Sequence, residues 1–320
     1  MIIHQTENPG GWMPPEERTN EQQSMSDEFR TAIGSFKEVG EAVELPERAL
    51  FHEMEIKHTG ALLKRPWQVT GSCVGVGGMR SYSNAALGDA VYRGDHEIVN
   101  LQFPFSTYGV GRKLAGMRGK GSGSFGGAQS KAVQQYGINA IDHPKVPQPR
   151  IRGQWAQWTK SQELAWSHSS YWSVDYDEMY QDAIKQSITD VVRVDDTEEL
   201  KQLLAQGYGV TLASSFGTRP RVRDGVLLGP WNGSWAHQMS CGGMWNHPRL
   251  GWIFVIDNQW GHAHGSCPEL SKLGVEGSFW ITEDTFASII KRGEVFGHSA
   301  TKGFPKKPIP WNEFAWKIEF

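Results

Sequence analysis

The chain has 320 residues, long enough to bury a sizeable core, with a formal net charge of −3 at pH 7 and a pI near 6.4. Such a charge provides no basic surface for nucleic acid or anionic lipid, and no apolar run approaches the roughly 20 residues that span a bilayer. The three cysteines are too few for a disulfide framework. We therefore expect no nucleic-acid partner and no membrane partner. With no secretory signal pattern at the start, we expect a cytoplasmic location, or a place in a particle assembled in the cytoplasm.

The first 60 residues are polar and contain helix-breaking stretches such as "PGG" and "MPPEE". This composition predicts an N-terminal arm over residues 1–60 that is flexible in part, with a short helix around "SDEFRTAIGSF". The arm could be a propeptide, a solvated tail or a contact for a protein partner. Of these, its polar composition favours the solvated tail.

Helical signals dominate the next part of the chain. A loop gives way to a helix at Cys73 in "QVTGSCVGVGG", and small apolar residues at helical spacing continue to a stop at Gly94. A second helix is predicted in "GGAQSKAVQQYG", where Gly137 marks its end. Residues 143–150, "HPKVPQPR", read as an extended connector because proline disfavours helix in the residue before it.

Strand signals dominate the second half. "DDTEELKQLLAQG" predicts a capped helix that leads into a strand, "YGVTLA". "GWIFVIDNQW" is a continuous apolar run typical of a strand buried on both faces, and "GSFWI" predicts another strand before a closing helix. The order indicates an α+β protein with a helical lobe over residues 61–185, a sheet lobe over 186–300 and a proline-rich tail over 301–320 that docks on the rest.

Cys73 is the candidate nucleophile. A thiol reacts as the thiolate, which is favoured at the start of a helix and beside an imidazole, where the thiol is partly exposed. Ser72 is a plausible cap for this helix, and the neighbouring glycines would let a substrate backbone approach. The side-chain amide of Gln68 and the backbone N–H of Cys73 could together stabilise an oxyanion.

His237 in "GSWAHQMSCGG" is the candidate base, and Asn258 stands 21 residues later (258 − 237 = 21), at the end of "WIFVIDNQW". Strands that lie side by side could bring these two side chains together, with the asparagine orienting the imidazole. Asp257 competes for that role, and because successive strand residues point to opposite faces only one of the two can reach the ring. If Asp257 does, the chemistry would be that of an amidase or a transglutaminase-like acyl transferase.

With these residues in this order, the chain resembles the papain-like cysteine peptidases. "QVTGSC" is similar to that family's cysteine motif, "AHQMSCGGM" to its histidine strand, and "WIFVIDNQWG" to its asparagine block. "GVEGSFWI", "GSFGGAQSKAVQQYGI" and "VRVDDTEELKQLLAQGYGVTLA" resemble further blocks in the family's order, over roughly residues 61–292. The resemblance implies a two-lobe α+β fold, with a helical lobe facing an antiparallel or barrel-like sheet lobe and the active site in the cleft between them.

The same resemblance implies a peptidase that forms a thioester with a polypeptide substrate and needs no cofactor or metal. Cys73 would be the nucleophile, His237 the base and then the acid, Asn258 the orienting group and Gln68 the oxyanion donor. The substrate-side residues that it implies, together with the cap proposed above, are Gly126, Gly127, Trp260 and Ser72. Trp260 would shield the histidine–asparagine bond, and the two glycines would bond an extended peptide.

Some features depart from the family pattern. Val74 replaces an aromatic residue, Gln259 replaces a serine, and a second tryptophan is absent from the loop after Trp260. The spacing from Cys73 to His237 is 164 residues (237 − 73 = 164), longer than about 130–150 in the family. We assign the surplus to a tryptophan-rich insertion over residues 143–180.

Two further readings stay open. Tryptophans between Trp155 and Trp172, including Trp158 and Trp166, could form a partner surface or pack inside the molecule. Together with the arm and the tail they would also suit a structural or assembly protein, in a virion for example, that retains a peptidase scaffold.

A metal site is the remaining alternative. His262, His264 and Cys267 have the composition of metal ligands but lack a fourth ligand at a zinc-type spacing. A glycine-rich surface loop accounts for this segment better than a metal site does, so we expect no metal.

Overall fold

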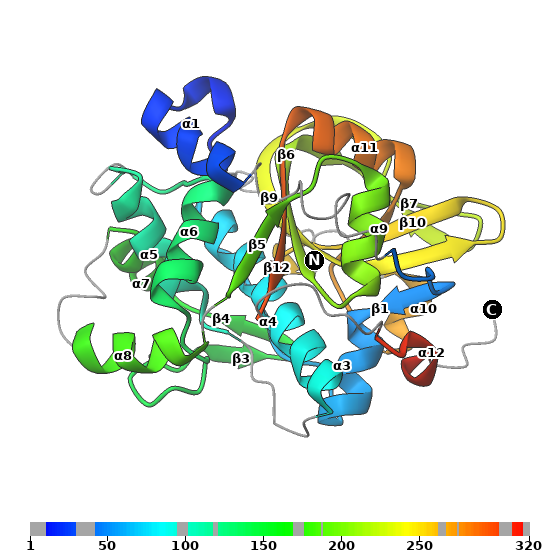
Figure 1. Cartoon of the computed structure of the whole chain (residues 1–320), viewed down its shortest axis with the longest axis horizontal. Helices are drawn as coiled ribbons and strands as arrows, with labels where there is room; N and C mark the ends of the chain where they lie inside the picture. Colours follow the sequence, from blue (N-terminus) through cyan, green and yellow to red (C-terminus); the bar gives the residue numbers. More distant parts are fainter. Residues whose placement is uncertain are drawn as a thin grey trace.

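The computed structural model describes residues 11–29, 42–94, 102–117, 121–168, 176–186, 188–261, 267–273, 275–300 and 309–315. A group of helices lies on one side of the molecule and a large sheet on the other, with helix α4 between them (Figure 1). Within the described ranges, no helix is long and apolar enough to cross a membrane.

The described helices are η1 (Pro15–Glu17), α1 (Asn20–Asp27), α3 (Phe51–Thr59), α4 (Cys73–Arg93), α5 (Pro104–Leu114), α6 (Gly126–Tyr136), α7 (Lys160–Ser167), α8 (Tyr176–Ala183), η4 (Ile184–Gln186), α9 (Thr197–Ala205), α10 (Pro268–Ser271), α11 (Glu283–Arg292) and α12 (Trp311–Phe314). The strands are β1 (Arg48–Leu50), β2 (Arg65–Pro66), β3 (Arg150–Arg152), β4 (Trp155–Gln157), β5 (Asp190–Arg193), β6 (Gly209–Thr218), β7 (Arg221–Arg223), β8 (Val226–Leu228), β9 (Trp231–His247), β10 (Gly251–Asp257), β11 (Ser278–Thr282) and β12 (Glu294–Ser299).

Helix α4 begins at Cys73 and ends at Gly94, as the sequence predicts, and Gly94 takes the left-handed conformation that ends many helices. Small residues let α4 press directly onto strand β6. A β-carbon built on Gly209 of β6 would stand only 1.8 Å from the carbonyl oxygen of Ser81 in α4. This contact leaves no room for any larger residue, so it fixes the helix, and with it Cys73, against the sheet.

The large sheet has the strand order β5-β12-β6-β9-β10-β11-β8-β7, and β1 pairs with β9 outside this path. Its pairings are antiparallel, apart from the parallel pair β11 and β8. The order starts at β5 and finishes at β7, so the sheet is open rather than a closed barrel. Adjacent strands β9 and β10 carry His237 and lead to Asn258, which places both residues at one region of the sheet.

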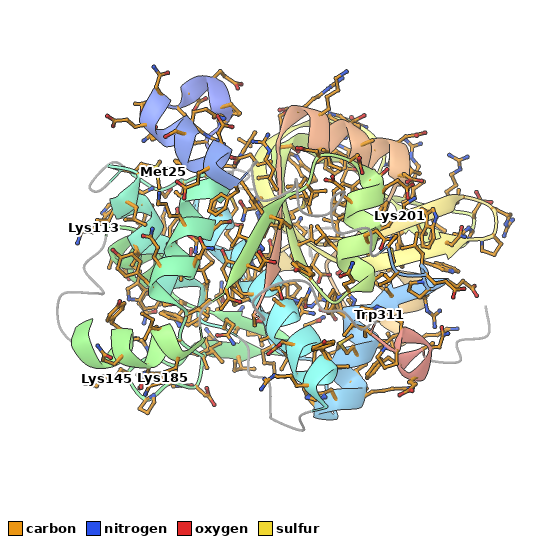
Figure 2. The ribbon with its side chains drawn as sticks, in the orientation of Figure 1. Met25, Lys113, Lys145, Lys185, Lys201 and Trp311 are labelled. Carbon is orange, nitrogen blue, oxygen red and sulfur yellow. The ribbon has the colours of Figure 1, made fainter. Side chains whose placement is uncertain are left out.

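Helix α9 starts as predicted, with the Asp196 side chain accepting a bond from the backbone of Glu199 at 2.8 Å. The tail docks against this part of the molecule. The indole nitrogen of Trp311, which is labelled in Figure 2, donates to the backbone oxygen of Ala205 at 2.7 Å. The Trp311 ring meets the ring of Phe51 edge-on. The described part of the tail is therefore held by the core.

The predicted arm contains two packed parts. Residues 48–59 form β1 and α3, and Leu50, Phe51 and Met54 of this segment are buried in the core of the sheet lobe. Helix α1 packs on α6 (Figure 1), while residues 30–41, where most of "SDEFRTAIGSF" falls, lie outside the described residues. The polar composition hid this packing because few apolar residues supply the buried surface.

The tryptophans of the predicted insertion fill the interior. Trp155, Trp158 and Trp166 are all buried, and the last two pack edge-on or tilted against Phe103 and Phe105 at centroid distances of 4.8 to 5.7 Å. Strand β4, which begins at Trp155, lies between β2 and β3 in a small three-stranded sheet. These three rings offer no surface to a partner, and Trp172 lies outside the described residues.

Candidate active site

Cys73 is the first residue of helix α4 and has no exposed surface. Burial raises the pKa of its thiol to about 12, although the backbone N–H groups of Gln238, Gly11 and Val74 act in the opposite direction. The sequence predicts a partly exposed thiolate, and the structure differs because a segment of the N-terminal arm covers the sulfur. The form described is therefore one with a protonated, enclosed thiol.

His237 lies in the middle of strand β9, and its Nε2 atom is 3.0 Å from Oδ1 of Asn258. The same oxygen accepts a bond from the backbone N–H of Gln259 at 2.8 Å. An amide oxygen can only accept, so His237 donates from Nε2. This bond directs the proton to Nε2 and leaves Nδ1 as the basic nitrogen of the neutral ring.

Trp260 stacks on the imidazole of His237, with ring centroids 4.3 Å apart and planes at 25°. This stacking covers one face of the imidazole that the bond to Asn258 holds. Trp235, two residues before His237 on the same strand, meets Trp260 edge-on at 4.9 Å. Trp235 thus adds a second tryptophan next to His237. Its position two residues before the histidine, in "WAH", could have indicated this contact from the sequence.

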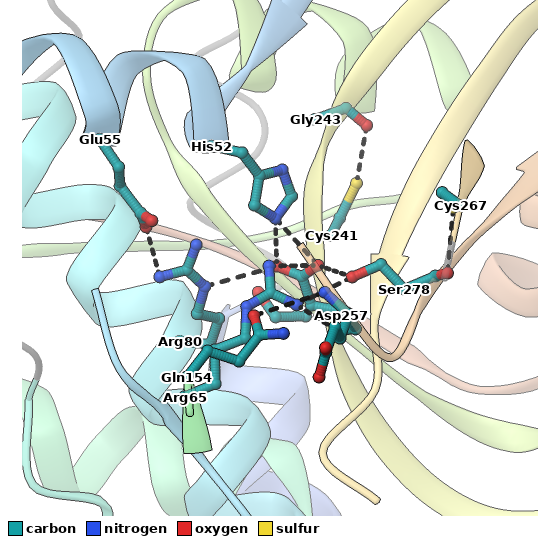
Figure 3. A network of polar contacts seen from close by, with 12 residues as sticks. His52, Glu55, Arg65, Arg80, Gln154, Cys241, Gly243, Asp257, Cys267 and Ser278 are labelled. Carbon is teal, nitrogen blue, oxygen red and sulfur yellow. Dashed lines mark hydrogen bonds and ion pairs between the residues drawn. The ribbon is translucent and has the colours of Figure 1, made fainter. Parts of the chain in front are cut away.

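Asp257 does not orient the imidazole, so the alternative in which it replaces Asn258 is wrong. Its carboxylate faces the opposite side of β10, where it accepts bonds from Ser278 Oγ at 2.6 Å, from His52 Nε2 at 3.1 Å and from Arg65 at 3.2 Å (Figure 3). The reason is the two-residue period of a strand, which sends neighbouring side chains to opposite faces. The orienting position belongs to Asn258.

Gln238, which follows His237, joins the two halves of the site. Its side-chain nitrogen donates to the backbone oxygen of Val74 at 3.1 Å, and its backbone N–H contacts the Cys73 thiol. A β-carbon on Gly77 of α4 would approach the Gln238 carbonyl oxygen to 3.0 Å. The first turns of α4 therefore lie directly on β9, which brings the thiol and the histidine strand together from positions 164 residues apart.

Gln68 is buried beside these residues, where its backbone N–H donates to Gln259 O at 2.9 Å. Its side-chain nitrogen donates to the backbone oxygen of Thr70 at 2.6 Å. The amide is thus part of the loop before Cys73.

Ser72 does not cap helix α4 through its side chain, contrary to expectation. The residue is buried, and its hydroxyl donates to Oε2 of Glu163 at 2.9 Å. Sequence reasoning missed Glu163, although an acidic residue beside apolar ones in "SQELAW" was a usable signal for a buried carboxylate.

Gly126 and Gly127 begin helix α6 and contact other parts of the chain. The backbone N–H of Gly126 donates to Oε2 of Glu294 at 3.2 Å, and a β-carbon on Gly127 would lie 2.3 Å from Oγ of Ser26 in α1. In this structure both glycines are covered by the arm and by the carboxylate that binds it.

Residues 11–13 cross the site as an extended segment. The backbone N–H groups of Gly11 and Trp12 donate to Ala236 O, which precedes His237, at 2.9 and 3.1 Å. Met13 donates to Ser124 O and Ser124 donates to Gly11 O, each at 2.8 Å, in a parallel bridge. The arm thus bonds the segments that lead to His237 and to Gly126. Nothing in its polar sequence predicted this contact.

The proposed metal ligands are only partly described. His262 and His264 lie outside the described residues, and the Cys267 thiol donates to Ser278 O at 3.0 Å. Among the residues with described positions, no three His, Cys, Asp or Glu side chains form a cluster that could hold a metal ion.

The arrangement can support acyl transfer to sulfur. A thiol begins a helix, a histidine with a fixed tautomer stands on the facing strand, and an amide side chain lies in the adjoining loop. Chemistry of this kind uses groups of these three types as nucleophile, base and oxyanion donor.

Comparison with known proteins finds no matching family model and no curated protein that matches in sequence. Solved structures do match. Xylellain, a cysteine protease from Xylella fastidiosa, aligns with a TM-score of 0.56 and 15% identity over 94% of this chain and 100% of its own. The bromelain protease from Ananas comosus, in complex with the E64 inhibitor, has a TM-score of 0.51 and 11% identity over 80% and 99%. ProCathepsin B S9 from Trypanosoma congolense has a TM-score of 0.50 and 14% identity over 91% and 85%.

Identities this low support a conclusion about the backbone fold alone. The backbones of these solved structures match the α+β arrangement seen here, in which helix α4 packs against the open sheet. The chain has the papain-like fold.

Proposed function

We propose that this protein is a cysteine peptidase that hydrolyses peptide bonds of an extended polypeptide through a thioester intermediate. The observation that carries the proposal is the His237–Asn258 bond on the strand that packs against the first turn of α4, where Cys73 lies. A retired scaffold has no need of a histidine held in one tautomer beside a helix-terminal thiol.

In the proposed reaction, His237 Nδ1 takes the proton of the Cys73 thiol, and the sulfur attacks the peptide carbonyl carbon. The carbonyl oxygen becomes an oxyanion bonded by the backbone N–H of Cys73 and by the side-chain amide of Gln68. His237 then gives its proton to the departing amine as the C–N bond breaks. Water, deprotonated by His237, attacks the thioester and releases the acid together with the thiol.

The arm gives the clearest support for an extended polypeptide substrate. Gly11, Trp12 and Met13 run through the site with their backbone bonded to Ala236 and Ser124, so a peptide in this conformation fits there. The same contacts exclude a substrate while they last. The proposal therefore treats the described form as latent, with the segment over residues 11–29 displaced before turnover.

The test is labelling and turnover with the arm displaced. The protein carrying Gly11→Ala, which cannot keep the arm in place, is incubated with a peptidyl epoxide and with casein under reducing conditions. We expect one label, mapped by mass spectrometry to Cys73, and casein cleavage that Cys73→Ala abolishes. Cys241→Ala is the matched control, since Cys241 is an equally buried thiol within β9. Casein cleavage that survives in Cys73→Ala would refute the assignment.

A second function is favoured by one observation, the complete burial of Cys73 under the arm. An assembly protein that keeps the scaffold would hold its thiol enclosed in this way. It would bind no epoxide and cut no casein even with Gly11→Ala in place, so the same experiment separates the two functions.

A further inference from the structure

The loop over residues 68–72 joins Gln68 to Cys73, and a carboxylate from helix α7 binds it. Oε2 of Glu163 accepts bonds from the backbone N–H of Thr70 at 3.1 Å, from its hydroxyl at 2.7 Å and from the Ser72 hydroxyl at 2.9 Å. Oε1 accepts from the backbone N–H of Val69 at 3.3 Å. One buried side chain thus binds three residues of a five-residue loop.

Gly71, the remaining residue between Gln68 and Cys73, is held from another helix. The hydroxyl of Tyr108 in α5 donates to Gly71 O at 3.0 Å and accepts from the backbone N–H of Gly123 at 2.9 Å. Every residue between Gln68 and Cys73 therefore has a polar contact with the helical lobe. Such contacts fix where the Gln68 amide and the Cys73 N–H point.

We propose that Glu163 is a positioning residue, which holds the loop so that the amide of Gln68 and the backbone N–H of Cys73 aim at one oxyanion. This inference rests on the proposed peptidase function, in which those two groups stabilise the tetrahedral intermediate. Glu163 does not touch the reacting atoms. It acts through the loop, by keeping two donors at the separation that the oxyanion requires.

The ionised form of Glu163 suits this role, because all four of its contacts are donors. A proton on either oxygen would turn that acceptor into a donor, which would then face an N–H or O–H group. Burial raises the pKa of Glu163 to about 7, against the hydrogen bonds of Thr70, Ser72 and Val69, which lower it. The carboxyl group therefore gains its proton as the pH falls through neutrality, and the loop loses acceptors at that point.

Helix α5, which packs against α7, carries the titratable or charged residues Tyr108, Arg112 and the exposed Lys113, and Cys73 begins α4 at the end of the loop. The Tyr108 hydroxyl is bonded to Gly71 and Gly123, as above. The guanidinium of Arg112 donates to backbone carbonyls, among them Ser167 O at 2.8 Å. These bonds are directed at backbone atoms, so the four loop donors are the contacts that favour the charge on Glu163.

The experiment compares Glu163→Gln with the parent protein, both carrying Gly11→Ala so that the arm is out of the way. We expect kcat to fall about 10- to 100-fold above pH 7, the range for a misplaced catalytic group, with KM little changed because the oxyanion forms only after binding. In the parent, kcat falls toward the Glu163→Gln value between pH 8 and about pH 5.5 as Glu163 is protonated. The two profiles should therefore converge at low pH.

Ser167→Ala is the matched control. Ser167 is buried on the same helix, and its hydroxyl bonds only the backbone oxygen of Glu163, at 2.7 Å, so kcat should hold. If Glu163→Gln does not fold, Thr70→Val and Ser72→Ala each remove one donor to the carboxylate and keep its charge. Each should then lower kcat in the same pH range.

If the plots of kcat against pH coincide for the parent and Glu163→Gln, the inference is overturned. The proposed peptidase function would still stand in that case. A parent that neither cleaves casein nor takes the epoxide label would instead refute the proposed function.

Discussion

Gly11 lies directly against Gly71, two residues before the candidate nucleophile. A β-carbon built on Gly11 would stand 1.9 Å from the carbonyl oxygen of Gly71, far inside any allowed contact. That oxygen is itself held by the Tyr108 hydroxyl at 3.0 Å, so the loop cannot easily withdraw. The arm and the loop before Cys73 can lie together only because position 11 is glycine.

Gly11→Ala is therefore expected to displace residues 11–13 and expose the thiol. Alkylation of Cys73 by iodoacetamide at pH 7 should accelerate by about tenfold or more, since burial now raises the pKa of the thiol to about 12. Removing that desolvation lowers the pKa, so the midpoint of the rate against pH should move downward. Rates are followed by mass spectrometry of the Cys73 peptide.

Glu16→Ala serves as the control, because Glu16 is exposed in the same arm. It should alkylate at the rate of the unaltered protein. An unchanged rate in Gly11→Ala would show that the arm does not limit access to the sulfur.

Glu294 fixes the arm to strand β12. Its carboxylate accepts two bonds from Arg18, at 2.6 and 2.7 Å, one from Ser26 at 2.5 Å and one from the Trp12 indole at 3.0 Å. Glu294→Gln leaves the Arg18 charge buried without its partner, which typically costs about 3 kcal/mol or more. Trypsin should therefore cleave at Arg18 faster in this variant, as peptide mapping over time would measure. Equal cleavage rates would exclude Glu294 as the anchor.

The same anchor predicts how the arm responds to acid. Burial alone would raise the pKa of Glu294, but the charge of Arg18 and the bonds from Arg18, Ser26 and Trp12 outweigh it and hold the pKa below the ordinary 4.5. A lowered carboxylate pKa means that the docking free energy is fully present above 4.5 and is lost as the pH falls through the folded value. Trypsin is inactive at such pH values, so pepsin is the protease to use. Because the docked arm is released as Glu294 gains its proton, pepsin cleavage of residues 11–29 should rise at low pH. A flat response would count against the ion pair.

The sequence was sufficient for the parts of the site that rest on local patterns. The helix start at Cys73 follows from the glycine spacing, and the end of β10 just before Asn258 follows from an apolar run. The place of His237 follows from the family resemblance. The choice between Asp257 and Asn258 required coordinates, because a period of two says that one residue faces the imidazole without saying which.

Contacts between distant polar segments could not be predicted in this way. Glu163 reaches Thr70 and Arg18 reaches Glu294 through hydrogen bonds, and Gly11 meets Gly71 through a close backbone contact. None of these contacts leaves a periodic trace in the chain. The tryptophans show a related limit, since Trp158 and Trp166 read equally well as a surface or as a core. Burial depends on which other aromatic rings the fold brings to them.

Asn258→Ala tests the orienting bond. Without Oδ1 the imidazole of His237 loses the 3.0 Å contact that fixes its tautomer and ring position. With Gly11→Ala in the background, we expect kcat to fall about 100-fold, the scale for a catalytic group displaced by 1 Å. Steady-state kinetics on a peptide substrate measures it, with Glu198→Ala, an exposed position of α9, as a control. A kcat within twofold of the parent would remove Asn258 from the mechanism.

Asp257→Asn should affect stability rather than chemistry, although the residue is next to Asn258. Burial would raise the pKa of Asp257, but Arg65, His52 and Arg80 hold it well below the ordinary 3.8. The carboxylate therefore contributes stability that is present above pH 3.8 and is lost as the pH falls through the folded value. Removing its charge leaves buried cations unbalanced, so we expect a loss of about 3 kcal/mol at neutral pH. Urea denaturation from pH 7 to pH 3 measures this loss, and the gap to the unaltered protein should narrow at the acid end. Equal unfolding midpoints at pH 7 would show that Arg65 and Arg80 are balanced without this carboxylate.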